Sequence, residues 1–129
     1  MKGILTLVPT PISDEIPLCP IAKELLLGAC EREDYILVEE HKAGRRRWLS
    51  YGLPRETIDK FILYNEHTFT EAGELTIKGL KKGKNAFLMS DCGLPAFCDP
   101  GRRLVESCHR NQIKVTATPF ANSVILAVA

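Results

Sequence analysis

The sequence Ala86-Phe87-Leu88-Met89-Ser90-Asp91-Cys92-Gly93-Leu94-Pro95-Ala96-Phe97-Cys98-Asp99-Pro100-Gly101 begins as an apolar, strand-like run, and a helix-like run follows it. The loop between them, 90–101, carries two prolines, two glycines and two aspartates. Open α/β sheets bind ligands at loops that follow the carboxyl ends of strands. Because a plain connector is usually shorter and merely polar, this loop predicts a binding site, although it does not name the ligand.

Apolar runs with the length and composition of strands recur on both sides of this loop. Five runs predict strands: 3–8, 35–38, 61–64, 86–89 and 113–118. Helical spacing is found in three sets between them: Ile21, Leu25, Leu26 and Ala29; Leu75, Ile77 and Leu80; and Leu104, Val105 and Cys108. Strands that alternate with helices predict an α/β fold with an open, mainly parallel five-stranded sheet and helices on both faces.

Composition narrows the class of protein. The 129 residues suit one domain with a real core, and 45% hydrophobic and 26% charged residues are ordinary for a soluble protein. The net charge of +1 gives no global attraction to nucleic acid. No apolar run approaches the roughly 20 residues of a membrane span. For that reason we expect no membrane contact. Five cysteines without a Cys-x-x-Cys pair predict reduced thiols in a cytoplasmic protein and no metal site.

Charge reverses sharply after the second predicted strand. Positions 31–40 carry five acids and one base, whereas positions 41–50 carry four bases and no acid. Basic residues beside an aromatic such as Trp48 suit a phosphate backbone with stacked bases. The candidate nucleic-acid contacts are Lys42, Arg45, Arg46 and Arg47. A solvated basic helix face is the alternative interpretation.

Titratable side chains follow the second and third predicted strands. Glu39 and Glu40 end one strand, and Glu66 with His67 follows the next, so these four are candidates for acid–base catalysis or for orienting a substrate. In a parallel sheet the loops 9–14, 39–47, 65–68 and 91–99 all open at one edge, which predicts a ligand site there. The first of them lacks the glycine-rich phosphate fingerprint.

Several motifs occur together and in a fixed order along the chain. They are Val8-Pro9-Thr10-Pro11-Ile12, Glu39-Glu40 with its basic segment, Tyr64-Asn65-Glu66-His67, Ser90-Asp91-Cys92-Gly93-Leu94-Pro95 and Asp99-Pro100-Gly101. With them the chain resembles the tetrapyrrole-methylase superfamily of S-adenosylmethionine-dependent methyltransferases. Within that superfamily it is most similar to the ribosomal small-subunit RNA (cytidine-2′-O)-methyltransferases.

The resemblance implies two α/β domains that clasp S-adenosylmethionine, with residues 1–129 as the first domain and the second one missing. It implies methyl transfer to a ribose 2′-hydroxyl of ribosomal RNA, and an isolated first domain is expected to lack turnover. The implied cofactor contacts are Pro9, Ile12, Asp91, Cys92, Gly93, Leu94, Phe97, Asn122 and Ser123. Lys42 and Arg45 to Arg47 would hold the phosphates of the RNA.

The chain also departs from the family pattern. Pro119-Phe120-Ala121-Asn122-Ser123 stands where relatives usually have Pro-Gly-Pro-Ser, Ser13 replaces a glycine, and His41-Lys42 replaces a Thr-Arg pair. Two other functions therefore stay open: a small-molecule methyltransferase acting on tetrapyrrole-like precursors, and a non-catalytic nucleotide-binding or interaction domain. The apolar terminal run 123–129 would also suit the interface of a homodimer.

Overall fold

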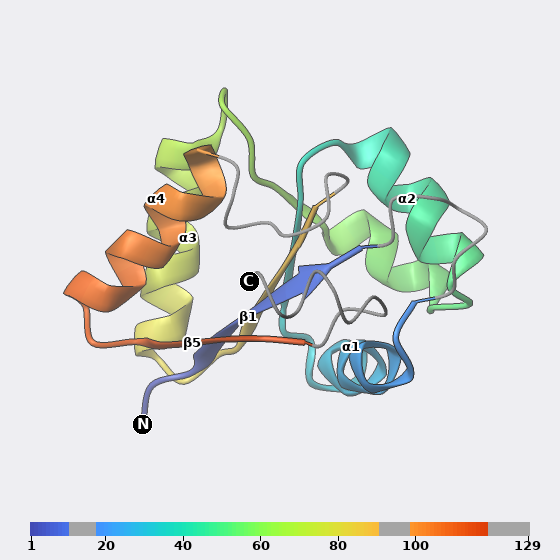
Figure 1. Ribbon diagram of the computed structural model, residues 1–129, viewed down its shortest axis with the longest axis horizontal. Helices are drawn as coiled ribbons and strands as arrows, with labels where there is room; N and C mark the ends of the chain where they lie inside the picture. The colour runs from blue at the N-terminus through green and yellow to red at the C-terminus, as the bar shows by residue number, and fades with distance from the viewer. Residues whose placement is uncertain (11–17, 91–98, 119–129) are drawn as a thin grey trace, which may run out of the picture.

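The computed structural model of the chain describes residues 1–10, 18–90 and 99–118 (Figure 1). Strands and helices alternate along it. In chain order they are β1 (Ile4–Pro9), α1 (Pro20–Arg32), β2 (Tyr35–Val38), α2 (His41–Ser50), the short 3-10 helix η1 (Arg55–Lys60), β3 (Ile62–Leu63), α3 (Phe69–Lys81), β4 (Ala86–Ser90), α4 (Asp99–Arg110) and β5 (Lys114–Ala117). The five predicted strands are confirmed, and β3 is shorter than its apolar run.

The strands form one sheet in the order β3-β2-β4-β1-β5, and every neighbouring pair is parallel. The register aligns Pro9 with Ser90 and Val38 with Leu63, so the carboxyl ends of neighbouring strands lie level. The α/β prediction is therefore confirmed. All five strands end at the same edge of the sheet, which is where the predicted loops were expected to meet.

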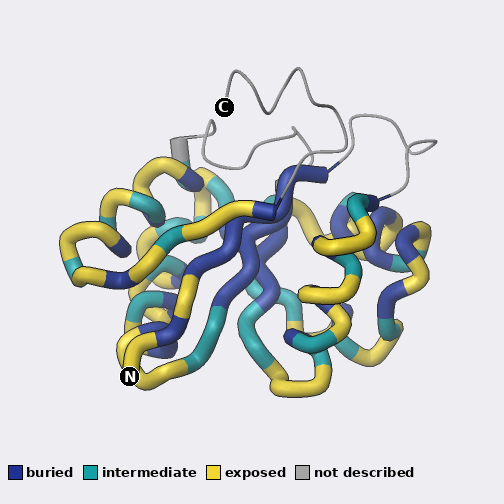
Figure 2. Tube along the Cα trace, turned by 60° about the horizontal axis from the view of Figure 1, so that its bottom comes forward, coloured by how far each residue is buried: buried dark blue, intermediate teal, exposed yellow. Residues whose placement is uncertain are grey.

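Helices cover both faces of the sheet, as predicted. In Figure 1, α1 and α2 lie on one side of the strands and α3 and α4 on the other. Alternate strand residues supply two cores. Val8 and Ile36 pack toward α1 and α2, whereas Leu7 and Leu37 pack toward α3 and α4. Figure 2 shows the buried strands inside a largely exposed outer surface.

The buried stripes of α1 and α3 differ from those predicted. In α1, Ala22 and Leu26 are buried while Ile21 and Leu25 are 54% and 42% exposed. In α3, Leu75 is 47% exposed, whereas Ala72, Thr76, Gly79 and Leu80 are buried. Small residues allow the helix backbone to approach the sheet closely, and Thr76 remains satisfied because its hydroxyl donates to the Ala72 carbonyl at 2.7 Å.

The structure also bears on membranes, metals and cysteines. None of the helices in the described ranges is long and apolar enough to cross a membrane. Across the same ranges, no three His, Cys, Asp or Glu side chains are grouped to hold a metal ion. Cys19, Cys30 and Cys108 are free thiols. Cys92 and Cys98 lie outside the described residues.

Candidate functional site

The carboxyl edge of the sheet is built from the ends of strands that are distant in sequence. Backbone hydrogen bonds extend the ladder past the regular strands: Thr118 N donates to the Leu7 carbonyl at 3.0 Å, and Tyr64 N donates to the Val38 carbonyl at 2.8 Å. Since open parallel sheets bind their ligands at this edge, these strand ends form the candidate functional site.

Asn65 ties the loop after β3 to the end of β2. Its Nδ2 donates to the Glu39 carbonyl at 2.8 Å, and its Oδ1 accepts from the backbone N–H of His67 at 2.8 Å and of Thr68 at 3.2 Å. The Thr68 hydroxyl in turn donates to the Leu63 carbonyl at 2.7 Å. The two predicted acid–base loops are therefore joined by hydrogen bonds immediately before α3 begins.

Sequence reasoning assigned no role to Asn65. The available signal was its position: asparagine readily forms a side-chain turn with backbone groups two or three residues ahead, and here those residues start a helix. The sequence does not indicate the hydrogen bond that Asn65 donates to the Glu39 carbonyl at the end of the neighbouring strand, and only the fold shows it.

The four acid–base candidates lie at this edge, but the structure does not bury them. Glu39 is half-buried, and Glu40, Glu66 and His67 are exposed. Glu40 immediately precedes α2, whereas Glu66 and His67 lie in the turn held by Asn65. The fold thus brings the two loops together without distinguishing one side chain as the base.

Of the predicted cofactor contacts, Pro9 is described, and it is buried at the carboxyl end of β1. The other eight lie outside the described residues: Ile12, Asp91, Cys92, Gly93, Leu94, Phe97, Asn122 and Ser123. The described part of the site therefore consists of the strand ends and the loops after β2 and β3.

Thr118 adds a polar group to the edge that sequence reasoning missed. The residue is 4% exposed, and its Oγ1 has no hydrogen-bond partner among the described residues. A buried hydroxyl without a partner costs about 1–3 kcal/mol, so such an atom is suited to bonding a ligand. Its position fits a cofactor with polar groups, as the predicted one has. No local sequence signal marks a single threonine after a strand.

The basic segment forms α2, and helical periodicity divides its side chains between two environments. Lys42, Arg45 and Arg46 are exposed, as predicted for contacts to a polyanion. Arg47 is 8% exposed, and Trp48 is fully buried. The structure therefore corrects the prediction that Arg47 and Trp48 face nucleic acid: both lie on the stripe that packs toward the sheet.

Trp48 is part of the core rather than a stacking platform. Its Nε1 donates to the Pro54 carbonyl at 2.6 Å, and its ring meets Phe61 edge-on with centroids 5.2 Å apart. Phe61 also contacts the His41 ring, at 6.1 Å between centroids. This aromatic row connects the start of α2 to η1 and to the segment that enters β3.

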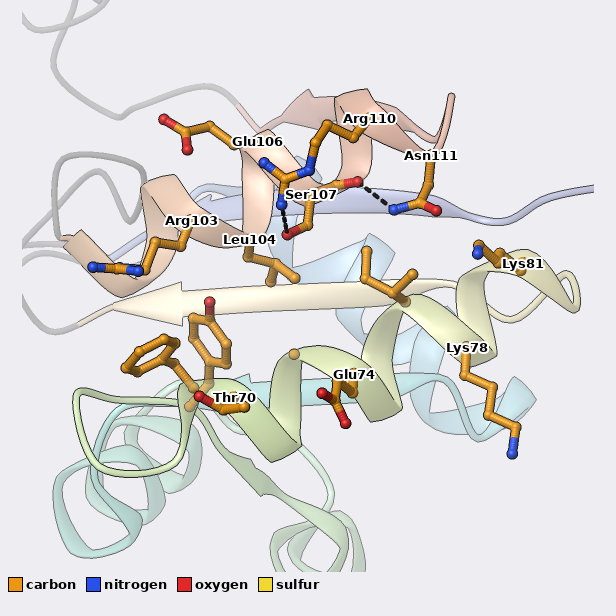
Figure 3. A pocket seen from close by; sticks show the side chains of 14 residues that line it. Thr70, Glu74, Lys78, Lys81, Arg103, Leu104, Glu106, Ser107, Arg110 and Asn111 are labelled. Atoms are coloured by element: carbon orange, nitrogen blue, oxygen red, sulfur yellow. Dashed lines mark hydrogen bonds between the residues drawn. The ribbon is translucent and has the colours of Figure 1, made fainter.

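On the opposite face, α3 and α4 border a hollow of about 600 Å³ (Figure 3). Its cations include Arg103, which lies 4.9 Å from the Phe69 ring centroid, and Arg110, whose Nη2 donates to the Ser107 hydroxyl at 3.0 Å. Tyr64 also lines the hollow, and its hydroxyl donates to the Pro100 carbonyl. Burial raises the pKa of Tyr64 to about 12.

Comparisons with known proteins identify relatives along nearly the whole chain, although no protein-family model matches it. The chain is 33% identical over 128 residues to ribosomal RNA small subunit methyltransferase I of Mesorhizobium japonicum, covering 99% of this chain and 41% of that protein. It is 33% identical over 126 residues to the protein of that name from Bacillus subtilis, covering 98% and 40%.

A third relative, ribosomal RNA small subunit methyltransferase I of Mesomycoplasma conjunctivae, is 30% identical over 132 residues, covering 100% of this chain and 51% of that protein. The chain thus spans between two fifths and about half the length of these relatives. The resemblance in the motifs is confirmed: the chain is homologous, over almost its whole length, to the amino-terminal part of ribosomal RNA small subunit methyltransferases of the tetrapyrrole-methylase family.

Proposed function

We propose that this chain is the cofactor-binding first domain of an S-adenosylmethionine-dependent methyltransferase that modifies a ribose 2′-hydroxyl of ribosomal RNA. The observation that carries the proposal is 33% identity over 128 residues with a protein named as a small-subunit ribosomal RNA methyltransferase. The parallel sheet supports it, because the family motifs follow strands whose ends share one edge. The proposed site of action is the cytoplasm.

The chemistry requires positioning more than a protein nucleophile. S-adenosylmethionine carries its methyl group on a sulfonium, which is already activated for in-line displacement, so alignment of the acceptor supplies much of the rate. The attacking hydroxyl must also lose its proton to a nearby base. The titratable candidates at the described edge are Glu39, Glu40, Glu66 and His67. Pro9 and the Thr118 hydroxyl border the same edge and suit the cofactor side of the crevice.

We assign residues 1–129 to one side of that crevice. The chain aligns with only 41% of its relative from Mesorhizobium japonicum, which supports a second domain in the complete enzyme. The isolated chain should then lack turnover, since the acceptor and the methyl group would not be enclosed together. Experiments on activity therefore require the longest product that the reading frame encodes.

Exposed cations on α2 support RNA as the acceptor. Lys42, Arg45 and Arg46 are exposed on this helix, which begins directly after the end of β2. An Arg46→Ala change should weaken RNA binding and flatten its dependence on salt while leaving cofactor affinity intact. Unchanged RNA affinity in this variant would remove Arg46 from the RNA-binding surface.

The first test is a calorimetric titration of S-adenosylhomocysteine into the longest product of the reading frame, with Gly93→Trp as the control. The expected result is saturable binding that Gly93→Trp abolishes, because a large side chain in the predicted cofactor loop would occupy the ligand's space. Absence of binding to the unaltered product would instead favour a non-catalytic interaction domain.

Transfer of a labelled methyl group then distinguishes the two possible acceptors. Label that appears in ribosomal RNA, and disappears at high salt, supports the proposed substrate. Salt-insensitive label in a tetrapyrrole-like precursor, with none in RNA, would overturn the RNA assignment and leave the methyltransferase assignment standing.

A further inference from the structure

A groove separates α2 from η1 on the α1 and α2 side of the sheet. The two helices lie side by side in Figure 1, and the hollow between them measures about 620 Å³. Lys42 and Arg45 line it from α2, and Arg55 and Asp59 line it from η1. The buried side chain of Ile58 also borders it. We call this hollow the α2–η1 groove.

The cations of the groove form no direct bond to the residues that the structure describes. Within the part of the chain that the structure describes, the side chains of Lys42, Arg45 and Arg55 form no hydrogen bond or ion pair. Three like charges around one hollow repel one another, which favours binding of an anion between them. Lys60, at the other end of η1, differs because its Nζ contacts Glu33 Oε1 at 2.8 Å.

Two carboxylates also line the groove, yet neither pairs with these cations. Asp59 is exposed and forms no ion pair among the described residues. Glu56 is likewise exposed and forms no ion pair among those residues. The three cations outnumber the two carboxylates, so the described lining keeps a small net positive charge. The carboxylates can accept hydrogen bonds from ribose or base groups.

The aromatic row holds the two walls of the groove in a fixed relation. His41 at the start of α2 packs against Phe61 just after η1, and Phe61 packs against Trp48. The Trp48 indole also donates to the Pro54 carbonyl, directly before η1. A groove whose walls are already positioned loses less conformational entropy when a ligand binds.

On these grounds, and resting on the proposed function, we propose that the α2–η1 groove binds the phosphodiester backbone of the RNA substrate, with Arg55 as a phosphate contact beside Lys42 and Arg45. Guanidinium groups suit this ligand because their planar N–H donors match phosphate oxygens. Since α2 starts where β2 ends, RNA held here lies next to the carboxyl edge of the sheet. Lys42 and Arg45 also border a second hollow with Arg46, which extends the contact across α2.

The test compares Arg55→Ala with Lys78→Ala in the longest product of the reading frame. Both changes remove one exposed cation, but Lys78 lies on α3, across the sheet. Binding to a fragment of small-subunit ribosomal RNA is measured by fluorescence anisotropy over a range of salt concentrations. Arg55→Ala should weaken binding roughly tenfold and lower the slope of log affinity against log salt by about one.

Lys78→Ala should change affinity by less than about twofold, and Arg55→Lys should restore most of the salt slope because it keeps the charge. Equal losses of RNA affinity in Arg55→Ala and Lys78→Ala would overturn the proposed role of the groove, because they would reflect general electrostatic attraction. An Arg55→Ala variant with unchanged affinity and slope would also overturn it.

Failure of the proposed function has a different signature. In that case the unaltered protein binds no RNA, although it still binds S-adenosylhomocysteine, and the groove loses its ligand as well. Urea unfolding of each variant shows that a loss of binding is not a loss of folding. Arg55 is exposed and its side chain makes no described hydrogen bond, so its replacement should leave the unfolding midpoint unchanged.

Discussion

The two faces of the sheet carry hollows of similar size, about 600 Å³ between α3 and α4 and about 620 Å³ between α2 and η1. Both are lined by lysines and arginines. In the first, Arg103 lies over the Phe69 ring and Arg110 donates to Ser107. In the second, Arg45 and Arg55 have no side-chain partner within the described ranges. The contrast lies in the arginines: those of the first hollow are engaged by neighbouring side chains, whereas Lys78 and Lys81, which also line it, have no bonded partner among the described residues. We therefore expect the second hollow to be the better phosphate site because its guanidinium donors are not engaged by described residues.

The faces also differ in how their helices are held. On the α2 side, an aromatic row and the bond from Trp48 to Pro54 anchor a helix whose outer surface is basic. On the α3 side, small residues allow close packing, and the Tyr64 hydroxyl anchors the first turn of α4 at Pro100. Each face thus relies on one large aromatic residue, and replacing these residues tests the comparison.

The largest effect is expected for Trp48→Ala on the α2 side. Removing a fully buried indole should lower the free energy of unfolding by about 3–5 kcal/mol, and the bond to Pro54 is lost with it. Urea unfolding followed by circular dichroism measures the change. Trp48→Phe, which keeps a ring in the core, should cost clearly less. A cost below about 1 kcal/mol for the alanine variant would show that Trp48 does not anchor this face.

A pair of glycines in α3 tests the close packing of the other face. A Cβ at Gly79 would overlap the Tyr35 ring, so Gly79→Ala should destabilise the chain by about 1–3 kcal/mol. At Gly73 the nearest atom to a new Cβ, Tyr64 Cε1, lies at an ordinary 3.7 Å. Gly73→Ala should therefore stabilise the helix by about 0.5–1 kcal/mol. Equal unfolding midpoints for the two variants would contradict the packing described for α3.

Tyr64→Phe tests the bond between the end of β3 and α4. The variant keeps the buried ring but leaves the Pro100 carbonyl without the hydroxyl, so the unfolding free energy should fall by about 1 kcal/mol. Chemical denaturation at neutral pH measures it. Tyr64→Leu, which also removes the ring, should cost more. A Phe variant as stable as the unaltered chain would mean that the bond contributes nothing net.

The smallest effect at neutral pH concerns titration on the α3 and α4 side. Burial raises the pKa of Cys108 from 9.0 to about 11 and that of Tyr64 from 10.0 to about 12. The folded chain thus holds these protons more tightly than the unfolded chain. The stability they contribute is complete below pH 9.0 and is lost as pH rises through 11 and 12.

Urea midpoints measured at increasing alkaline pH should therefore fall steadily. Cys108→Ala should remove the earlier part of this alkaline decline, and Tyr64→Phe should remove the later part. Each variant is compared with its own midpoint at neutral pH, which separates titration from lost packing. If neither substitution alters the alkaline fall in the urea midpoint, other titrating groups cause that fall.

Much of the site's location was predictable, whereas its detailed composition was not. The basic run 41–48 indicated a polyanion surface, and the 3.6-residue period could already have separated Arg46 from Arg47. No pattern in the sequence connects Arg45 with Arg55, since they become neighbours only when η1 folds back along α2. The bond from Asn65 to the Glu39 carbonyl is likewise a contact between loops far apart in the chain.

The succession of strands and helices, the parallel α/β class and the resemblance to ribosomal RNA methyltransferases could all be predicted from the sequence, because periodicity, element length and motif order are local properties of the chain. Three features could be read only from the folded chain: the strand order β3-β2-β4-β1-β5, the burial of Ala22 rather than Ile21, and which cations the described residues leave without a bonded partner. These features depend on how closely separate elements can pack, and that is a property of the surfaces that meet rather than of either segment alone.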